Sequence, residues 1–324
     1  MTTIVTVSPR EAGLRLDHIV ARHVEGMSVR VAARLIMAGV VRVNGRTASK
    51  GLRLREGDRI EMHDVDSIRS DGDFDPPPDP GVGIVVLLRD ERLLVADKPA
   101  GMHSAPVRGG ERPTLVGAVV ASVPEAARVR GHSAREAGLV HRLDQATSGA
   151  CLFALDQDAF DRLSTANESD LVVKDYLAVV EGHVPEGLPT LEAEIPAGLS
   201  RGRRVHVRSV RRLRARSLAH ATGPDGTRLA RMRVEVTGRS ARHCLVQVKL
   251  TRGFRHQVRS VLAAIGHPIT GDEIYGGRVC LAGLMLHASR IVFPHPTDGR
   301  LVRVDSPPVR IEECWARVRG GTFA

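Results

Sequence analysis

Reactive side chains gather in one short stretch of the chain, residues 141–156, which reads HRLDQATSGACLFALD. A histidine, an arginine and a carboxylate fall within its first four residues, a small polar turn follows, and an apolar run then begins. The carboxylate is Asp144. A cation beside it would favour its ionised form, in which it can act as a nucleophile or a base. Taken alone, the stretch has a second interpretation, because an ion-paired turn at the entrance to a buried strand would use the same residues.

Four other stretches carry polar residues in an order that supports the reactive interpretation. They read ADKPAGMHSAP (96–106), KDYLAVVEG (174–182), RGFRHQVRSVLAAIGHPITGDEIYGG (252–277) and LMLHASRIVFPHP (284–296). Together with the H-R-L-D-x-x-T-S-G pattern of residues 141–149, they resemble the signature sequences of the RluA family of RNA pseudouridine synthases. The pattern at 141–149 is long and highly specific.

The resemblance implies one reaction, in which the N-glycosidic bond of a uridine breaks, the uracil turns, and C5 bonds to the sugar. Asp144 is expected to act on the ribose, either as a nucleophile at C1′ or as a base at C2′. Arg259 matches the family arginine that pairs with this aspartate. Tyr176 matches the tyrosine that stacks on the flipped uracil. The target base must leave its stack to react, and we expect Arg142 to fill the vacated space, since guanidinium planes stack on bases.

Further residues near these motifs are expected to contact RNA, namely His141, Arg255, His256 and Gln257. The chain departs from the family at two places here. It has GFRHQ at 253–257 where the family has G-R-x-H-Q, and Ser260 replaces a usual histidine. Both departures leave the three catalytic candidates in place, so they bear on RNA contacts rather than on the chemistry.

The expected reaction needs no redox partner, metal or nucleotide cofactor, and no sequence motif indicates one. The chain has no G-x-x-x-x-G-K-[ST] loop and no G-x-G-x-x-G between a strand and a helix. Its cysteines contain no C-x-x-C pair, so neither a zinc site nor a disulfide framework is indicated; they are Cys151, Cys244, Cys280 and Cys314. Four histidines have spacings that fit no compact ligand set, and we interpret them as hydrogen-bonding residues: His103, His256, His267 and His287.

Residues 1–62 are predicted to form a small α/β RNA-binding domain. LRLDHIVARHV and SVRVAARLIMAG have apolar residues at helical spacing, and VVRVNG and LREGDRIEM indicate strands beside turns. The unit has eleven Lys/Arg and six Asp/Glu, and it resembles the alpha-L RNA-binding domain, although the family usually has Ser-Arg where this chain has Ser28-Val29. Residues expected to contact RNA are Arg15, Ser28, Arg30, Arg34 and Asn44. The alternative is a small helical cap that binds nothing.

The charge balance favours a phosphate-rich partner. The 324 residues include 47 Lys/Arg and 37 Asp/Glu, and 43 of the basic residues are arginines, whose guanidinium groups match phosphate oxygens. The alternative is a codon bias that turned surface lysines into arginines. Residues 196–216 carry eight arginines and no acid. As a helix or strand this segment would repel itself, so we interpret it as an RNA-clamping insertion, with a solvated loop as the alternative.

Residues 63–84 contain six aspartates and four prolines and are predicted to be an extended linker. Residues 85–324 alternate strands, hairpins and helices, which is typical of an α+β fold. The family resemblance implies the pseudouridine synthase fold, with a mixed, mainly antiparallel central sheet. No apolar run reaches membrane-spanning length. We expect a monomer in the cytoplasm, with no membrane partner and reduced cysteines.

These patterns predict an RNA pseudouridine synthase, and the order of its domains most resembles members that act on large-subunit ribosomal RNA. Transfer RNA is the alternative substrate. A catalytically idle RNA-binding protein, such as a ribosome-assembly factor, is the rival from another class, and the presence of all three catalytic candidates argues against it. A ribosomal RNA methyltransferase is disfavoured because no glycine-rich cofactor loop follows a strand.

Overall fold

Residues 1–62 have a hydrophobic core of their own. The buried apolar residues of the later part of the chain form separate cores. The structure is a computed structural model. It describes residues 2–9, 11–24, 27, 29–37, 39–63, 75–107, 109–196, 204–213, 217–219, 221–222 and 227–320. In this part of the chain, no helix has the length and apolar character needed to cross a membrane.

The N-terminal unit packs two helices on a small antiparallel sheet. The helices are α1 (Leu16–His23) and α2 (Val29–Met37), and the sheet order is β1-β4-β2-β3, with β1 at Thr2–Thr6, β2 at Val41–Val43, β3 at Arg46–Thr47 and β4 at Arg59–His63. Leu16, Ile19, Val20, Leu35 and Ile36 are buried, as the helical spacing predicts. Asn44 and Gly45 both have positive φ, which two-residue hairpin turns require.

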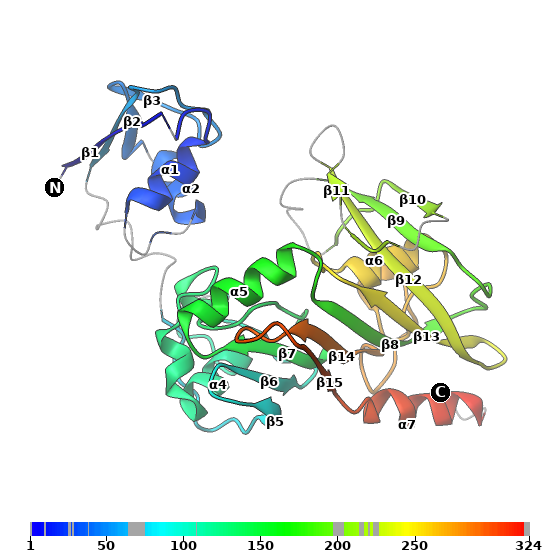
Figure 1. Ribbon diagram of the computed structural model, residues 1–324. Coiled ribbons are helices and arrows are strands. Elements are labelled where there is room, and N and C mark those ends of the chain that lie inside the picture. Colours follow the sequence, from blue (N-terminus) through cyan, green and yellow to red (C-terminus); the bar gives the residue numbers. More distant parts are fainter. Residues whose placement is uncertain are drawn as a thin grey trace.

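The rest of the described chain is built on one large sheet (Figure 1). Its order is β10-β9-β12-β13-β8-β14-β7-β6-β5, with β11 beside β12 and β15 beside β14. Within the described residues, β14 and β7 form the single parallel pair, so the prediction of a mixed, mainly antiparallel sheet is confirmed. The strands are β5 Val85–Arg89, β6 Leu93–Lys98, β7 Ser148–Ala154, β8 Val173–Glu181, β9 Thr190–Ile195, β10 Ser209–Leu213, β11 Ala221–Thr222, β12 Arg228–Arg239, β13 His243–Leu250, β14 Leu286–Pro294 and β15 Leu301–Asp305.

Helices cover both faces of this sheet. Along β7, Cys151 and Phe153 enter the core shared with α4, α6 and α7, whereas Ala150 and Leu152 enter the core shared with α5 (Figure 1). This alternation explains why an apolar run follows Asp144, because a strand buried on both faces has no polar side. The helices are α4 Leu115–Ser122, α5 Gln157–Glu168, α6 Gln257–Ala264 and α7 Val309–Arg319, with short 3-10 turns η2 Pro124–Arg128, η3 Ala134–Glu136 and η4 Glu273–Tyr275.

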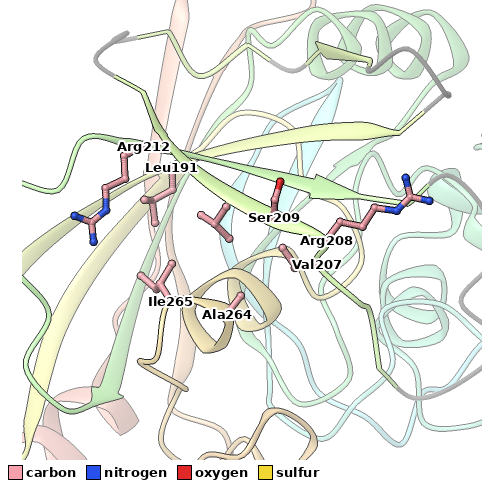
Figure 2. Close-up of a pocket in the computed structure, with 8 residues that line it drawn as sticks. Leu191, Val207, Arg208, Ser209, Arg212, Ala264 and Ile265 are labelled. Carbon is pink, nitrogen blue, oxygen red and sulfur yellow. The ribbon is translucent and has the colours of Figure 1, made fainter.

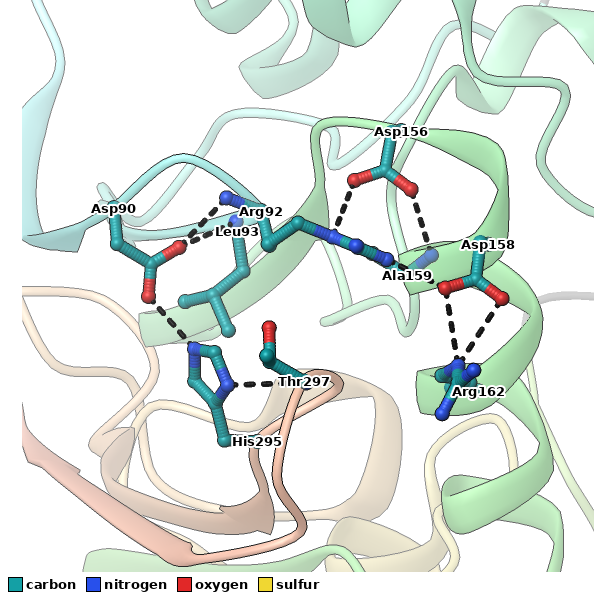
Figure 3. Close-up of polar contacts among 9 residues, drawn as sticks. All are labelled: Asp90, Arg92, Leu93, Asp156, Asp158, Ala159, Arg162, His295 and Thr297. Atoms are coloured by element: carbon teal, nitrogen blue, oxygen red, sulfur yellow. Dashed lines mark hydrogen bonds and ion pairs between the residues drawn. The ribbon is translucent and has the colours of Figure 1, made fainter.

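A polar network fixes the β5–β6 hairpin to its neighbours (Figure 3). The carboxylate of Asp90 accepts the backbone N–H groups of Arg92 and Leu93 at 2.8 and 2.9 Å. It also lies 2.9 Å from Nε2 of His295, which follows β14. The side chain of Arg92 reaches Asp156, which caps the N-terminus of α5, at 2.7 Å. The hairpin, α5 and the end of β14 are therefore held together by an ion pair and by hydrogen bonds to a carboxylate.

The last part of the predicted linker lies against α4. The backbone N–H of Asp79 donates to the carbonyl oxygen of Gly117 at 2.9 Å. A Cβ atom at Gly117 would lie 2.8 Å from the carbonyl oxygen of Pro77, so this approach requires a glycine. Residues 75–84 are therefore in contact with the body that follows them, and residues 64–74 lie outside the described part.

The expectation that the arginine-rich segment 196–216 cannot form a strand is wrong for Ser209–Leu213. These residues form β10, which pairs antiparallel with β9 at one edge of the large sheet. The reason is that β9 supplies acids to the partner strand. Nη2 of Arg211 lies 3.1 Å from Oε1 of Glu194, so the repulsion among the arginines is offset by attraction across the strands. Residues 197–203 and 214–216 lie outside the described part.

Candidate active site

Asp144 lies in a loop that ends at β7, and the loop is held from several sides. The hydroxyl of Ser104 donates to the carbonyl oxygen of Leu143 at 2.8 Å and accepts its N–H at 3.0 Å. The carbonyl oxygen of Gln145 accepts the N–H of Gly101 at 2.8 Å, and the carbonyl oxygen of Asp144 itself accepts the N–H of Thr147 at 3.0 Å. The backbone on both sides of Asp144 is therefore fixed by the loop that follows β6.

Lys98, the last residue of β6, is buried between the loop that follows β6 and the loop that contains Asp144. Its Nζ donates to the carbonyl oxygens of Pro99, Met102 and Gln145 at 2.8, 2.7 and 3.1 Å. Burial lowers the pKa of Lys98 to about 8, and the negative charge of Asp144 opposes this shift. Sequence analysis quoted the K-P-A-G motif but gave Lys98 no role. A signal was available, since Lys98 is one of only four lysines in an arginine-rich chain.

Arg259, near the start of α6, connects Asp144 to a second carboxylate. Its Nη1 lies 3.4 Å from Oδ2 of Asp144. Its Nε and Nη2 donate to the two carboxylate oxygens of Asp272 at 2.7 and 2.8 Å. Burial by itself would lower the pKa of Arg259, but the bonds to Asp272 and the charge of Asp144 raise it above its ordinary value. Sequence analysis quoted the stretch that contains Asp272 but gave this residue no role.

Tyr176 lies on β8, where it is buried in the core that also contains Leu143. Burial raises the pKa of Tyr176 well above its ordinary value, and the negative charge of Asp144 adds to the shift. The phenol therefore keeps its proton at neutral pH. The structure thus brings Asp144, Arg259 and Tyr176 together from three elements that are distant in sequence.

His256 lies in the site as well, between Asp144 and Tyr275. Its Nε2 is 3.9 Å from Oδ1 of Asp144, and its Nδ1 is 3.0 Å from the hydroxyl oxygen of Tyr275. Burial lowers the pKa of His256, and the charge of Asp144 opposes the shift. A neutral imidazole therefore faces the carboxylate. Sequence analysis expected this residue to contact RNA and did not place it beside Asp144.

Two other residues expected to contact RNA are engaged inside the protein. The side chain of Gln257 is buried, accepts the N–H of Phe254 at 3.1 Å and donates to the carbonyl oxygen of Arg231 at 3.2 Å. Nε2 of His141 accepts the N–H of Leu152 at 3.3 Å, and burial holds the pKa of His141 well below its ordinary value. These positions argue against direct RNA contacts by either side chain.

The exposed arginines of the site are placed differently. Arg142 has 62% of its side chain exposed, and its Nη1 lies 3.1 Å from Oε1 of the buried Glu136. Arg255, just before His256, is exposed too. Both positions are compatible with the expected contacts to RNA.

In the N-terminal unit, the residues expected to contact RNA lie as follows. Arg15 donates to both carboxylate oxygens of Asp17 at 3.0 and 2.6 Å, and 45% of its side chain is exposed. Asn44 is bonded to Asp58 and to the backbone N–H of Arg59, both at 2.9 Å, and so braces the hairpin. Arg30 and Arg34 belong to α2, and nothing is described of their side chains. Ser28 lies outside the described residues.

A separate hollow of about 340 Å³ lies between β9, β10 and the end of α6 (Figure 2). Leu191 and Ile265 face it, while Arg208 and Arg212 extend to either side. None of the catalytic candidates lines this hollow, so it is distinct from the site around Asp144. In the described part of the chain, no group of three His, Cys, Asp or Glu side chains is placed to hold a metal ion.

Comparisons with known proteins found matches for both parts of the chain. A family model described as RNA pseudouridylate synthase matches residues 92–264, and one described as S4 domain matches residues 14–60. An uncharacterized RNA pseudouridine synthase of Mycobacterium bovis is 31% identical, over 95% of this chain and 96% of the relative. The ribosomal large subunit pseudouridine synthase C of Salmonella typhimurium is 30% identical, over 94% of this chain and 92% of the relative.

Solved structures support the fold. Human RNA Pseudouridylate Synthase Domain Containing 1 matches with a TM-score of 0.52 at 23% identity, over 69% of this chain and 83% of that chain. At this identity the likeness concerns the fold alone.

Proposed function

The chain belongs to the RNA pseudouridylate synthase family, and on this premise we propose that it isomerises uridines of large-subunit ribosomal RNA to pseudouridine. The substrate class is supported by relatives named for the ribosomal large subunit, which match nearly the full length of the chain. The net charge of +10 suits a structured RNA, whose phosphates supply sequence-independent affinity.

The observation that carries the catalytic assignment is the position of Asp144 beside Arg259. The ribose must be attacked at C1′ or deprotonated at C2′, and either step needs an ionised carboxylate beneath a stacked base. A base that covers the carboxylate excludes water from it. Nη1 of Arg259, 3.4 Å from Oδ2, then supplies the opposite charge beside it. Asp144 is therefore proposed as the group that acts on the sugar.

The remaining residues are proposed to hold the uracil and to move protons. When C5 of the uracil bonds to C1′, C5 must lose a proton and N1 must gain one, so the isomerisation is balanced without a cofactor. Tyr176 keeps its phenolic proton and offers an aromatic face for the flipped base, since aromatic rings stack on bases. Arg142, exposed and bonded at one end to Glu136, is proposed to occupy the space that the flipped nucleotide leaves.

The proposed division of labour assigns affinity and chemistry to different parts of the chain. Residues 1–62 are proposed as an RNA anchor, residues 63–84 as a linker, and residues 85–324 as the catalytic domain. The arginines of β10 are proposed to contact phosphates, because Arg211 and Arg212 are exposed at the edge of the large sheet. We also propose that the protein acts as a monomer in the cytoplasm, which size-exclusion chromatography with light scattering and cell fractionation would test.

The substrate class is tested by deleting the gene and mapping pseudouridines in total RNA by chemical labelling. The proposal predicts the loss of one or more sites in large-subunit ribosomal RNA. Expression of the wild-type protein should restore the sites, and expression of Asp144→Asn should not. A site lost from transfer RNA would overturn the ribosomal assignment and favour the alternative substrate. An unchanged map would favour an RNA-binding protein that is catalytically idle.

A further inference from the structure

The hydroxyl of Tyr275, in the turn η4, joins two hydrogen bonds. The backbone N–H of Val205 donates to its oxygen at 2.7 Å, and Nδ1 of His256 lies 3.0 Å from the same oxygen. The backbone N–H of Val205 can only donate a hydrogen bond, so the proton of the Tyr275 hydroxyl is available for Nδ1 of His256. Within the described residues this hydroxyl has no other hydrogen-bond partner. The satisfied arrangement therefore has Nδ1 as the acceptor, which places the proton of neutral His256 on Nε2.

The protonated nitrogen of His256 is the one that faces the catalytic carboxylate. Nε2 lies 3.9 Å from Oδ1 of Asp144, while Nη1 of Arg259 lies 3.4 Å from Oδ2. Each oxygen thus faces a different donor. Both distances exceed the roughly 2.7–2.9 Å of a tight charge-assisted hydrogen bond. At 3.9 Å, Nε2 faces Oδ1 without a hydrogen bond, so the lone pairs of the carboxylate stay available to the ribose.

The backbone and ring of His256 are held in one arrangement. The residue precedes α6 in the left-handed region, with φ 55° and ψ 19°, which residues other than glycine adopt only with backbone strain. Its ring meets the Tyr275 ring edge to face, with centroids 5.7 Å apart. The charged and titratable groups around it are Asp144, Arg255, Arg259, Asp272 and Tyr275. A conformation of this kind at a catalytic site is an observation that calls for a function.

We propose that His256, with its ring oriented by the Tyr275 hydroxyl, is a positioning residue for Asp144. Nε2 directs Oδ1, Arg259 directs Oδ2, and together they fix the rotation of the carboxylate beneath the ribose. Asp144 makes the contact with substrate, and His256 acts through it. This inference rests on the function proposed above. It assigns His256 a role in the rate of the reaction and not in RNA affinity.

Two substitutions at this position separate positioning from packing. His256→Gln keeps an oxygen that can accept from Tyr275 and an N–H that can face Asp144, whereas His256→Leu fills the space with neither. At saturating RNA, we expect the single-turnover rate to fall about 100-fold in His256→Leu and by less than about tenfold in His256→Gln. The Kd for RNA should change by less than about threefold in both variants.

Tyr275→Phe keeps the ring and removes only the hydroxyl, so it tests the orienting bond even if His256→Leu does not fold. We expect its rate to fall about tenfold, and we expect no further loss when it is combined with His256→Leu, because the two residues act in series. His267→Gln is the matched control. Nδ1 of His267 lies 3.0 Å from a backbone oxygen of Glu181, and this variant should keep its rate.

Equal rates in the Gln and Leu variants, or a loss of RNA affinity in place of rate, would overturn the proposal. Additive effects of Tyr275→Phe and His256→Leu would overturn the coupling between the two residues. Asp144→Asn is measured in parallel. If that variant stays active, the proposed function of Asp144 fails, and this outcome is distinct from a failure confined to His256.

Discussion

Arg259 donates two N–H groups to Asp272, at 2.7 and 2.8 Å, and turns its remaining nitrogen toward Asp144 at 3.4 Å. The two acids share one cation unequally. Asp272 has 1% of its side chain exposed and makes the tight, two-point contact, while Asp144 has 21% exposed and makes the looser one. The cation is therefore anchored by Asp272 and remains available to the carboxylate that is proposed to react.

Asp272→Asn tests this unequal sharing. The amide keeps the shape of the side chain but removes the charge that anchors Arg259. Breaking a buried ion pair in this way costs about 3–5 kcal/mol, so urea unfolding should show a loss of at least about 2 kcal/mol after partial relaxation. With its anchor weakened, Arg259 should bind Asp144 more tightly, and the single-turnover rate should fall by at least about tenfold. Glu273→Gln, a change at the exposed neighbour, is the control. Unchanged stability and rate in Asp272→Asn would contradict the anchoring role.

Asp144→Asn should abolish pseudouridine formation. An amide can neither attack C1′ nor take a proton from C2′, so the step assigned to Asp144 is lost. RNA binding should stay within about tenfold, which corresponds to about 1.4 kcal/mol, because the residues proposed to contact phosphates lie elsewhere. Tritium release from RNA labelled at C5 of uridine and gel-shift titration measure the two quantities. Turnover above about one per cent of the wild-type rate, an order-of-magnitude allowance for a group that acts directly, would remove Asp144 from the mechanism.

The sequence predicts local structure well where periodicity is strong. The helices and strands of the N-terminal unit lie where the patterns place them, and residues 85–320 alternate strands, hairpins and helices as predicted. The family resemblance also selects Asp144 and Arg259, which the structure brings together. The predictions of secondary structure succeed because side-chain periodicity is a local property of the chain.

The remaining features depend on contacts between distant segments. Asp272 is the anchor of Arg259 only because a turn after α6 returns to it, and no spacing rule distinguishes it from Glu273. His256 was expected at the RNA surface. Its own backbone lies in the left-handed region just before α6, and its ring faces Asp144 instead. The strand β10 was missed because its arginines repel one another in isolation, and the compensating acids lie on β9. Charge compensation across strands cannot be read from one segment alone.

The stability of the protein should rise with pH above neutrality because of Lys174. Burial lowers the pKa of Lys174 to about 7 from the ordinary 10.5. Below about pH 7, Lys174 is protonated in both the folded and the unfolded chain, so the folded state bears the full cost of the buried charge. Between the two pKa values only the unfolded chain keeps the proton on Lys174, and the free energy of unfolding therefore rises with pH across this window. A neutral amine still has two N–H groups, enough for its bonds to Asn167 and Thr251.

Urea unfolding from about pH 6.5 to about pH 9 measures this contribution. As the pH rises, the free energy of unfolding should increase more in the wild type than in Lys174→Met. Lys50→Met, at an exposed lysine, should run parallel to the wild type at every pH. A constant difference between the wild type and Lys174→Met would show that Lys174 stays protonated throughout.

Removal of residues 1–62 should weaken RNA binding far more than it slows the reaction. This unit has five more basic than acidic residues and its own hydrophobic core, and none of the residues around Asp144 belongs to it. Each lost phosphate contact should reduce the slope of log affinity against log salt by roughly 0.7–0.9. Single-turnover rates against RNA concentration, at two salt concentrations, separate the affinity from the saturating rate.

A variant with Arg211→Gln and Arg212→Gln on β10 tests in the same assay whether the edge strand also contributes to RNA binding. If the truncated protein keeps its affinity and salt slope, the N-terminal unit is not an RNA anchor. If it is folded and its saturating rate collapses, the unit helps to form the active site, and the proposed division of labour is wrong.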